Sequence, residues 1–172
     1  MTALHCGTGE SDDLDALVRE LQDPEISRWV HPIPSPYGQR EGREFLQFAD
    51  DERSGETGAH LAGLSSQTGD LLGSVALSKI DWDNRSAHLG YWTAKGARNS
   101  GVARRASRLV TAWAFHRLDI ERIELLCDPE NIPSQRVAEA LGFKREGHLR
   151  SHLKLPQGRR DSLVYGLLSS DA

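Results

Sequence analysis

Apolar positions recur with one period in the first third of the chain and with another period after it. Leu14, Leu17, Val18 and Leu21 are spaced as on one face of a helix, which predicts a first helix over residues 12–22. The stretch DPEISRWVHPIPSPYG that follows holds four of the seven prolines, so we expect a loop or short turns there. A second helix is expected around residues 39–52.

The period then changes to that of strands. The segments AHLAGLSS, LLGSVALSKI and SAHLGYWT are short and are separated by the turn signals QTGD and DWDNR. This pattern predicts an antiparallel meander of three strands. A helix begins near Gly101 after the meander. Its apolar face, expected to pack on the sheet, consists of Val102, Ala106, Leu109, Val110 and Trp113.

The segment RIELLCD predicts the next strand, because Ile123, Leu125 and Cys127 alternate with other positions. A strand, a helix and a strand in that order imply a right-handed crossover and a parallel pair. Asn131 can cap a short helix that Gly142 closes, and FKREGHLR with DSLVYGLL resembles a final hairpin. The fold class is therefore α/β (α+β), with a mixed, mostly antiparallel sheet of about six or seven strands flanked by helices.

Composition narrows the class of protein. The 172 residues are 38% hydrophobic and 27% charged, with no apolar run of bilayer length, so we expect one domain over residues 1–172 and no membrane partner. The first residues lack a secretory pattern, which favours a cytoplasmic location. A net charge of −4 argues against a general nucleic-acid binder. Two cysteines are too few for a disulfide framework or a zinc site, so we expect no metal.

Positive charge nevertheless gathers in GARNSGVARRASRLV, residues 96–110. A strand that ends near Thr93, a glycine-bearing loop and a helix that begins near Gly101 bring unpaired N–H groups to the positive end of a helix dipole, which favours an anion. The dinucleotide and P-loop patterns are both missing. Glycine and polar residues also mark ordinary helix starts, so the anion site is one of two interpretations.

Within this loop, Arg98-x-x-Gly101-x-Ala103 resembles the pyrophosphate-binding signature Q/R-x-x-G-x-G/A of the GNAT superfamily of acyl-CoA-dependent N-acyltransferases. LGYWT precedes the loop, and NIPSQRVAEALGF follows the next strand, as in that family. The later G-x-L-R and D…VY-x-L segments resemble the RimJ/RimL-like branch of protein N-terminal acetyltransferases. The resemblance covers about residues 59–168, whereas residues 1–58 match only in layout.

The resemblance implies a GNAT-like fold in which a central parallel strand pair splays apart and forms the acyl-CoA cleft. It implies acetyl-CoA as donor, with CoA as product, and direct attack by a primary amine, either a protein N-terminal amine or a small-molecule amine. It also implies a homodimer. Acyl-CoA and an amine acceptor are thus the expected partners, and no metal is required.

The resemblance also assigns donor-binding residues. The strand edge that pairs with pantetheine would be Tyr91, Trp92 and Thr93. The pyrophosphate would be held by Arg98, Asn99, Ser100, Gly101, Val102 and Ala103. Arg104 or Arg105 would meet the ribose phosphate, or else form a solvated helix face. Asn131 would contact pantetheine, or else act only as a helix cap.

Catalytic roles follow the resemblance less closely. Ala138 stands where many members have a tyrosine acid, so Ser134 is our candidate hydrogen-bond donor to the leaving thiolate, with a capping role as the alternative. His88 stands where the branch often has a glutamate base, and its alternative role is structural. The acceptor would meet Trp29, His31 and Tyr37 in the proline-rich loop, which can equally cover the core. Asp81, with Asp83, could hold the amine or simply shape a turn.

Three functional hypotheses remain after this comparison. The first is an acetyl-CoA-dependent N-acetyltransferase, with a longer donor such as succinyl-CoA as a variant. The second is a CoA-binding module that has lost catalysis, with Ala138 and His88 as the losses. The third is a helix-start anion site for an unrelated nucleotide.

Overall fold

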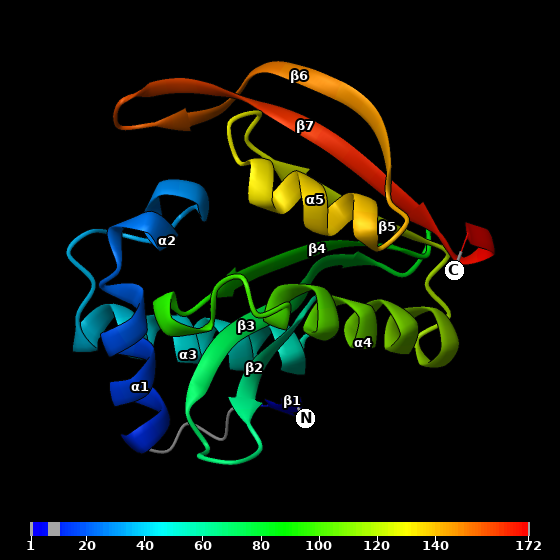
Figure 1. Ribbon diagram of the computed structural model, residues 1–172. Coiled ribbons are helices and arrows are strands. Elements are labelled where there is room, and N and C mark those ends of the chain that lie inside the picture. Colours follow the sequence, from blue (N-terminus) through cyan, green and yellow to red (C-terminus); the bar gives the residue numbers. More distant parts are fainter. Residues whose placement is uncertain (1, 7–10, 172) are drawn as a thin grey trace.

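The computed structural model describes residues 2–6 and 11–171. Within them a single sheet has the strand order β1-β2-β3-β4-β5-β7-β6 (Figure 1). The strands are β1 (Thr2–Cys6), β2 (Ala59–Ser65), β3 (Leu71–Asp81), β4 (Ser86–Thr93), β5 (Arg122–Cys127), β6 (Lys144–Leu155) and β7 (Gly158–Leu168). The helices are α1 (Ser11–Leu21), α2 (Pro24–Trp29), α3 (Gln39–Ser54), α4 (Val102–Arg117) and α5 (Ile132–Ala140), with short 3-10 turns η1 (Lys95–Ala97) and η2 (Ser169–Asp171).

Pairing in the sheet is antiparallel except between β4 and β5. The predicted meander is confirmed as β2, β3 and β4, and the predicted crossover through α4 places β5 parallel to β4. The parallel ladder is short, because it joins only Ser86–His88 to Arg122–Glu124. Beyond it, β4 stays paired with β3 and β5 with β7, so the sheet divides along this line.

Two large hydrophobic clusters cover the two faces of the sheet, and a third, small one is formed by Ala94, Ala97 and Val102. The larger one joins α4 and α5 to strand residues such as Leu77 and Ile123, both fully buried. The second large one joins α1, α2 and α3 and includes Leu17. Tyr91 packs on the first cluster and its neighbour Trp92 on the second, as expected for adjacent strand positions. The two helix groups therefore cover opposite faces of β4 (Figure 1).

The buried face of α4 differs from the prediction. Val102, Ala106 and Val110 are buried as expected, but Leu109 and Trp113 are 50% and 37% exposed. The buried side continues instead through Ala114, Ser107 and Thr111. Because α4 packs on the sheet and also contacts α5, its covered surface is rotated toward these small side chains. The five-residue face predicted from the sequence was therefore wrong at two positions.

Other elements follow local chemistry. The proline-rich stretch contains the short helix α2, which begins with Pro24 and is capped by the Asp23 side chain, an acceptor for Glu25 N at 3.1 Å. The sequence also did not predict β1, which pairs with β2. The predicted cap of α5 by Asn131 and its closure at Gly142, with φ of 89°, are confirmed. In the described ranges, no helix combines the length and apolar character that a membrane crossing needs.

Candidate active site

The line where β4 and β5 separate leaves a strand edge open. Tyr91, Trp92 and Thr93 pair with β3 on one side, while their other side lies past the last parallel pair with β5. Backbone N–H and C=O groups on such an edge need partners, which an extended ligand can supply. The edge that the resemblance assigned to pantetheine is thus open in the fold, and its use by a donor stays a prediction.

The loop before α4 presents unpaired donors. In the part of the chain that the structure describes, the backbone N–H groups of residues 99–104 donate to no carbonyl. Asn99 and Gly101 have φ of 59° and 78°, a backbone shape that turns successive N–H groups toward one concave side. Together with the start of a 16-residue helix, these donors fit a diphosphate group.

Side chains hold this loop in shape. Ser100 Oγ donates to Ala97 O at 2.6 Å, and Arg105 Nη1 donates to Ser100 O at 2.8 Å. An ideal Cβ at Gly101 would lie 3.1 Å from Arg105 Nη1, so the glycine also leaves room for this guanidinium. Arg105 therefore supports the loop, which leaves the exposed Arg104 as the better candidate for a ribose phosphate.

The signature arginine has an intramolecular partner. Arg98 Nη2 donates to Asp23 Oδ2 at 2.5 Å, and the side chains of the two residues are 32% and 14% exposed. The same carboxylate caps α2 through its other oxygen. The loop before α4 is therefore tied to the start of α2, the helix that ends at Trp29.

Three side chains from different elements meet beside the open edge. Ser134, in the first turn of α5, shares a hydrogen bond of 3.0 Å between its Oγ and the hydroxyl of Tyr91. Burial raises the pKa of Tyr91 to about 12, a rise that the hydrogen bond to Ser134 partly offsets. Burial likewise raises the pKa of Cys127, at the end of β5, to about 11. All three groups are therefore protonated near neutral pH.

Asn131 positions Ser134. The carboxamide oxygen of Asn131 accepts from Ser134 N at 3.2 Å, so the capping role that the sequence suggested is present. A contact of Asn131 with pantetheine stays a prediction. Since the cap fixes the first turn of α5, it also fixes the direction of the Ser134 hydroxyl toward Tyr91.

His88 is the last residue of β4 that pairs with β5, and its side chain lies on the opposite face of the sheet from that of Tyr91. Its side chain is 31% exposed, and its Nε2 lies 4.0 Å from Glu124 Oε2. Burial lowers the pKa of His88, as do Lys79 and Arg122, whereas Glu124 raises it. The imidazole is therefore neutral near pH 7 and can accept a proton.

The residues predicted to bind the acceptor do not all lie near the open strand edge. Trp29 is the last residue of α2, and His31 follows it by two positions. Tyr37 is only 5% exposed, and its hydroxyl donates to Glu41 O at 3.4 Å, so it belongs to the core. Asp81 lies opposite Ser86, at the start of β4, where it accepts from Asn84 N and Nδ2. The open strand edge lies at the other end of β4. Asp81 is therefore remote from that edge and stabilises the turn between β3 and β4.

The sequence analysis did not single out two charged residues that lie near α2. Arg160 of β7 donates through Nε to Asp128 Oδ2 at 2.8 Å, just past the end of β5. Burial lowers the pKa of His31, and the charges of Arg160 and Asp128 also act on it, which places α2 near this pair. The order C-D-P-E-N after a buried strand was the available signal for Asp128, since polar residues at strand ends commonly line sites.

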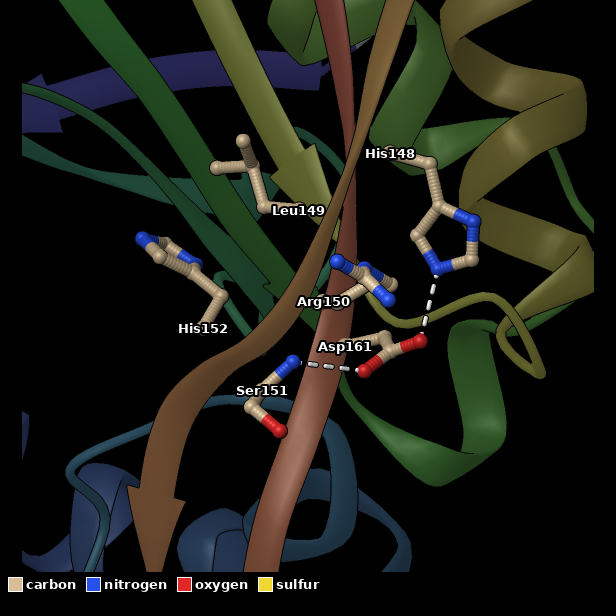
Figure 2. A pocket seen from close by; sticks show the side chains of 6 residues that line it. All are labelled: His148, Leu149, Arg150, Ser151, His152 and Asp161. Atoms are coloured by element: carbon tan, nitrogen blue, oxygen red, sulfur yellow. Dashed lines mark hydrogen bonds and ion pairs between the residues drawn. The ribbon is translucent and has the colours of Figure 1, made fainter.

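The β6–β7 hairpin extends past the rest of the sheet (Figure 1). The hairpin carries an open hollow of about 760 Å³. In it, Asp161 Oδ2 pairs with His148 Nε2 at 2.7 Å, and Asp161 Oδ1 accepts from the backbone N–H of Ser151 at 2.7 Å (Figure 2). The hollow is lined by His148, Leu149, Arg150, Ser151, His152 and Asp161. The sequence did not predict this concave polar surface, because it forms only when the two strands pair.

Comparison with known proteins identifies the arrangement. Residues 8–144 match the family described as acetyltransferase (GNAT) domain. An uncharacterized N-acetyltransferase p20 of Bacillus licheniformis is 26% identical over 94% of this chain and 90% of its own length. The ribosomal-protein-serine acetyltransferase of Escherichia coli is 24% identical over 62% of this chain and 64% of its own.

A solved structure shares the fold. The spermidine N-acetyltransferase from Vibrio cholerae, in complex with CoA and spermine, superimposes with a TM-score of 0.83. The superposition covers 99% of this chain and 96% of that one at 22% identity.

Proposed function

Since the chain belongs to the GNAT family of acetyltransferases, and within it to the RimJ/RimL-like branch, we propose that it transfers the acetyl group of acetyl-CoA to a primary amine. The class of activity, acyl-CoA-dependent N-acyl transfer, follows from the family. The acetyl group and the roles of individual residues are our proposal. The observation that carries it is the adjacency of an open strand edge and a loop of unpaired N–H groups.

Residues 98–103 would hold the diphosphate of the donor, and the edge at Tyr91, Trp92 and Thr93 would pair with its pantetheine arm. When bound, acetyl-CoA supplies an acyl carbon activated as a thioester. In the reaction a carbon–nitrogen bond forms, the carbon–sulfur bond breaks, one proton leaves the amine, and the thiolate gains one. The chain must therefore accept a proton on one side and stabilise sulfur on the other.

Ser134 is suited to the sulfur side. Its hydroxyl shares a hydrogen bond of 3.0 Å with the hydroxyl of Tyr91, in which either group can donate. With Tyr91 as donor, the Ser134 hydroxyl is free to donate to sulfur, and more strongly than an isolated hydroxyl would. His88 is suited to the amine side, because it is neutral near pH 7 and partly exposed. The presence of both groups favours an active enzyme over a CoA-binding module without catalysis.

The acceptor is a protein N-terminal amine or a small-molecule amine. The relative from Escherichia coli is named for a ribosomal protein and the solved structure for spermidine, so each class has a precedent in the family. We further propose a cytoplasmic enzyme with one domain over residues 1–172. The family resemblance supports a homodimer.

Thermal unfolding with added nucleotides tests the donor. Acetyl-CoA at about a hundredfold above its dissociation constant should stabilise the fold by about 2.7 kcal/mol. For a chain of this size this is a rise of about 5–10 °C in the melting temperature. ATP and NAD at the same concentration should produce no rise. A rise with ATP or NAD, and none with CoA species, would contradict the donor assignment.

Release of CoA thiol tests the transfer. We expect thiol release from acetyl-CoA in the presence of a tripeptide with N-terminal serine or of spermidine, and less from succinyl-CoA. Ser134→Ala should lower kcat by about tenfold or more while leaving the affinity for CoA unchanged. Glu139→Ala, at an exposed position of the same helix α5, is the matched control. Equal kcat for Ser134→Ala and the natural chain would move the donor role to another group.

A further inference from the structure

His88 faces a carboxylate across the parallel ladder. It lies directly opposite Glu124 in register, and these two residues form the last pair before β4 and β5 separate. Side chains paired in this way project to the same face of the sheet. Both are about one-third exposed, at 31% and 32%, and the 4.0 Å between His88 Nε2 and Glu124 Oε2 makes the contact electrostatic.

Glu124 is held from its other side. Arg122 donates to Glu124 Oε1 through Nε at 3.2 Å and through Nη2 at 3.1 Å. Both of these hydrogen bonds use Oε1, so Oε2 is the oxygen that faces the imidazole. A carboxylate fixed by a neighbouring guanidinium in this way has a defined orientation.

A second acid supports Arg122. Glu146, on the edge strand β6, accepts from Arg122 Nη1 at 3.0 Å and from Nη2 at 2.5 Å. To reach it, Glu146 crosses the intervening strand β7 above Gly166, where an ideal Cβ would lie 2.3 Å from Glu146 Oε1. The absence of a side chain at Gly166 thus lets charges from β6, β5 and β4 form one row.

The groups that face His88 come from two neighbouring strands. Lys79 of β3 and Arg122 of β5 disfavour its protonated form, and Glu124 favours it. Glu146 neutralises part of the charge of Arg122. Among the described residues, the carboxylate of Glu124 is therefore the facing group that stabilises an imidazolium formed during turnover.

We propose that Glu124 is a positioning residue for His88, whose imidazole it orients and whose protonated form it stabilises. The inference rests on the proposed role of His88 as the base. Nε2 carries the hydrogen that points toward Glu124 Oε2, so the lone pair of Nδ1 accepts the proton that leaves the attacking amine. No oxidation is involved, and the proton later returns to solvent or to the thiolate.

An NMR titration tests the coupling without an acceptor. The ring resonance of His88, assigned by its loss in His88→Gln, is followed against pH in the natural chain, in Glu124→Gln and in Glu146→Gln. Glu124→Gln should move the midpoint to lower pH, because it removes the group that favours the charged ring. Glu146→Gln is the matched control, since it also removes an acid partner of Arg122 but does not face His88. Its midpoint should move to lower pH by less than that of Glu124→Gln, because it acts on His88 only through the charge of Arg122.

Kinetics separate the two proposals. With acetyl-CoA and the N-terminal serine tripeptide or spermidine, whichever is turned over, His88→Gln should lower kcat by about 100-fold and abolish the acid limb of kcat/KM. Glu124→Gln should lower kcat by about tenfold, shift that limb to lower pH and leave the KM for acetyl-CoA unchanged. A limb lost in His88→Gln but unmoved in Glu124→Gln would overturn the role of Glu124 alone. Full activity of His88→Gln would overturn both roles.

A charge substitution provides the second test. In His88→Glu the new carboxylate faces Glu124, and the like charge of Glu124 raises the pKa of the new carboxyl group. The acid limb should therefore lie at higher pH in His88→Glu than in the double variant His88→Glu/Glu124→Gln. Identical profiles for these two variants would overturn the proposal.

Discussion

Asp23 performs two tasks with its two carboxylate oxygens, and replacing it in two ways separates them. Asp23→Ser keeps a good helix cap but removes the ion pair with Arg98, whereas Asp23→Ala removes both. The cap contributes about 1 kcal/mol. The ion pair is partly exposed, at 14% and 32%, so a value near the upper end of surface pairs, about 1 kcal/mol, is expected.

The loss in free energy of unfolding should therefore be about 1 kcal/mol for Asp23→Ser and about 2 kcal/mol for Asp23→Ala. In a chain of this length, the second value corresponds to a fall of about 4–8 °C in melting temperature. Urea unfolding and calorimetry measure both. A double-mutant cycle with Arg98→Met should give a coupling of about 1 kcal/mol with Asp23→Ser. Additive effects in that cycle would refute the ion pair, and equal losses for the two Asp23 variants would refute the cap.

Two further outcomes follow from titratable groups. Cys127 is 8% exposed, and burial raises its pKa to about 11. In a Cys6→Ser variant, iodoacetamide should therefore modify Cys127 at least about tenfold more slowly in the native chain than in the urea-unfolded chain. Equal rates would contradict the burial of Cys127. Hydrogen bonds from Ser151 N and His148 lower the pKa of Asp161 in the folded chain. Ionised Asp161 therefore stabilises the hairpin fully above its unfolded-state pKa, and this stabilisation is lost as the pH falls through the lower pKa of the folded chain. Amide exchange at Ser151 should accelerate in that acid range, and Asp161→Asn should remove this pH dependence.

The order of elements from the meander to the final hairpin could be predicted because hydrophobic period and turn residues agree there. The helix α2 was missed although Asp23, Pro24 and Glu25 carry cap and first-turn signals, because prolines dominate the stretch around it. The buried face of α4 could not be predicted fully, since Leu109 is 50% exposed and Ser107 is buried, and the side of a helix that is covered depends on the elements that pack against it. Periodicity gives the presence of a helix more securely than its orientation.

The candidate site was predictable where it depends on backbone shape in one segment. The loop at residues 98–103 is of that kind, because glycine, its neighbours and the following helix lie within a few residues of one another. Contacts between distant segments were not predictable. Tyr91 and Ser134 are 43 positions apart, and the facing of His88 and Glu124 depends on the register of two strands.

The short ladder between β4 and β5 has a mechanical consequence. In the described residues, the ladder that joins the half-sheet β1–β4 to the half-sheet β5–β7 contains three residues on each strand, and just before it Arg85 O accepts from Glu121 N and Arg122 N. A molecule seated on the free edge would bridge the two halves in place of the missing hydrogen bonds. The bound donor would then take the place of a strand between β4 and β5. Its departure after each turnover would weaken the connection between the half-sheet that carries His88 and the one next to Ser134.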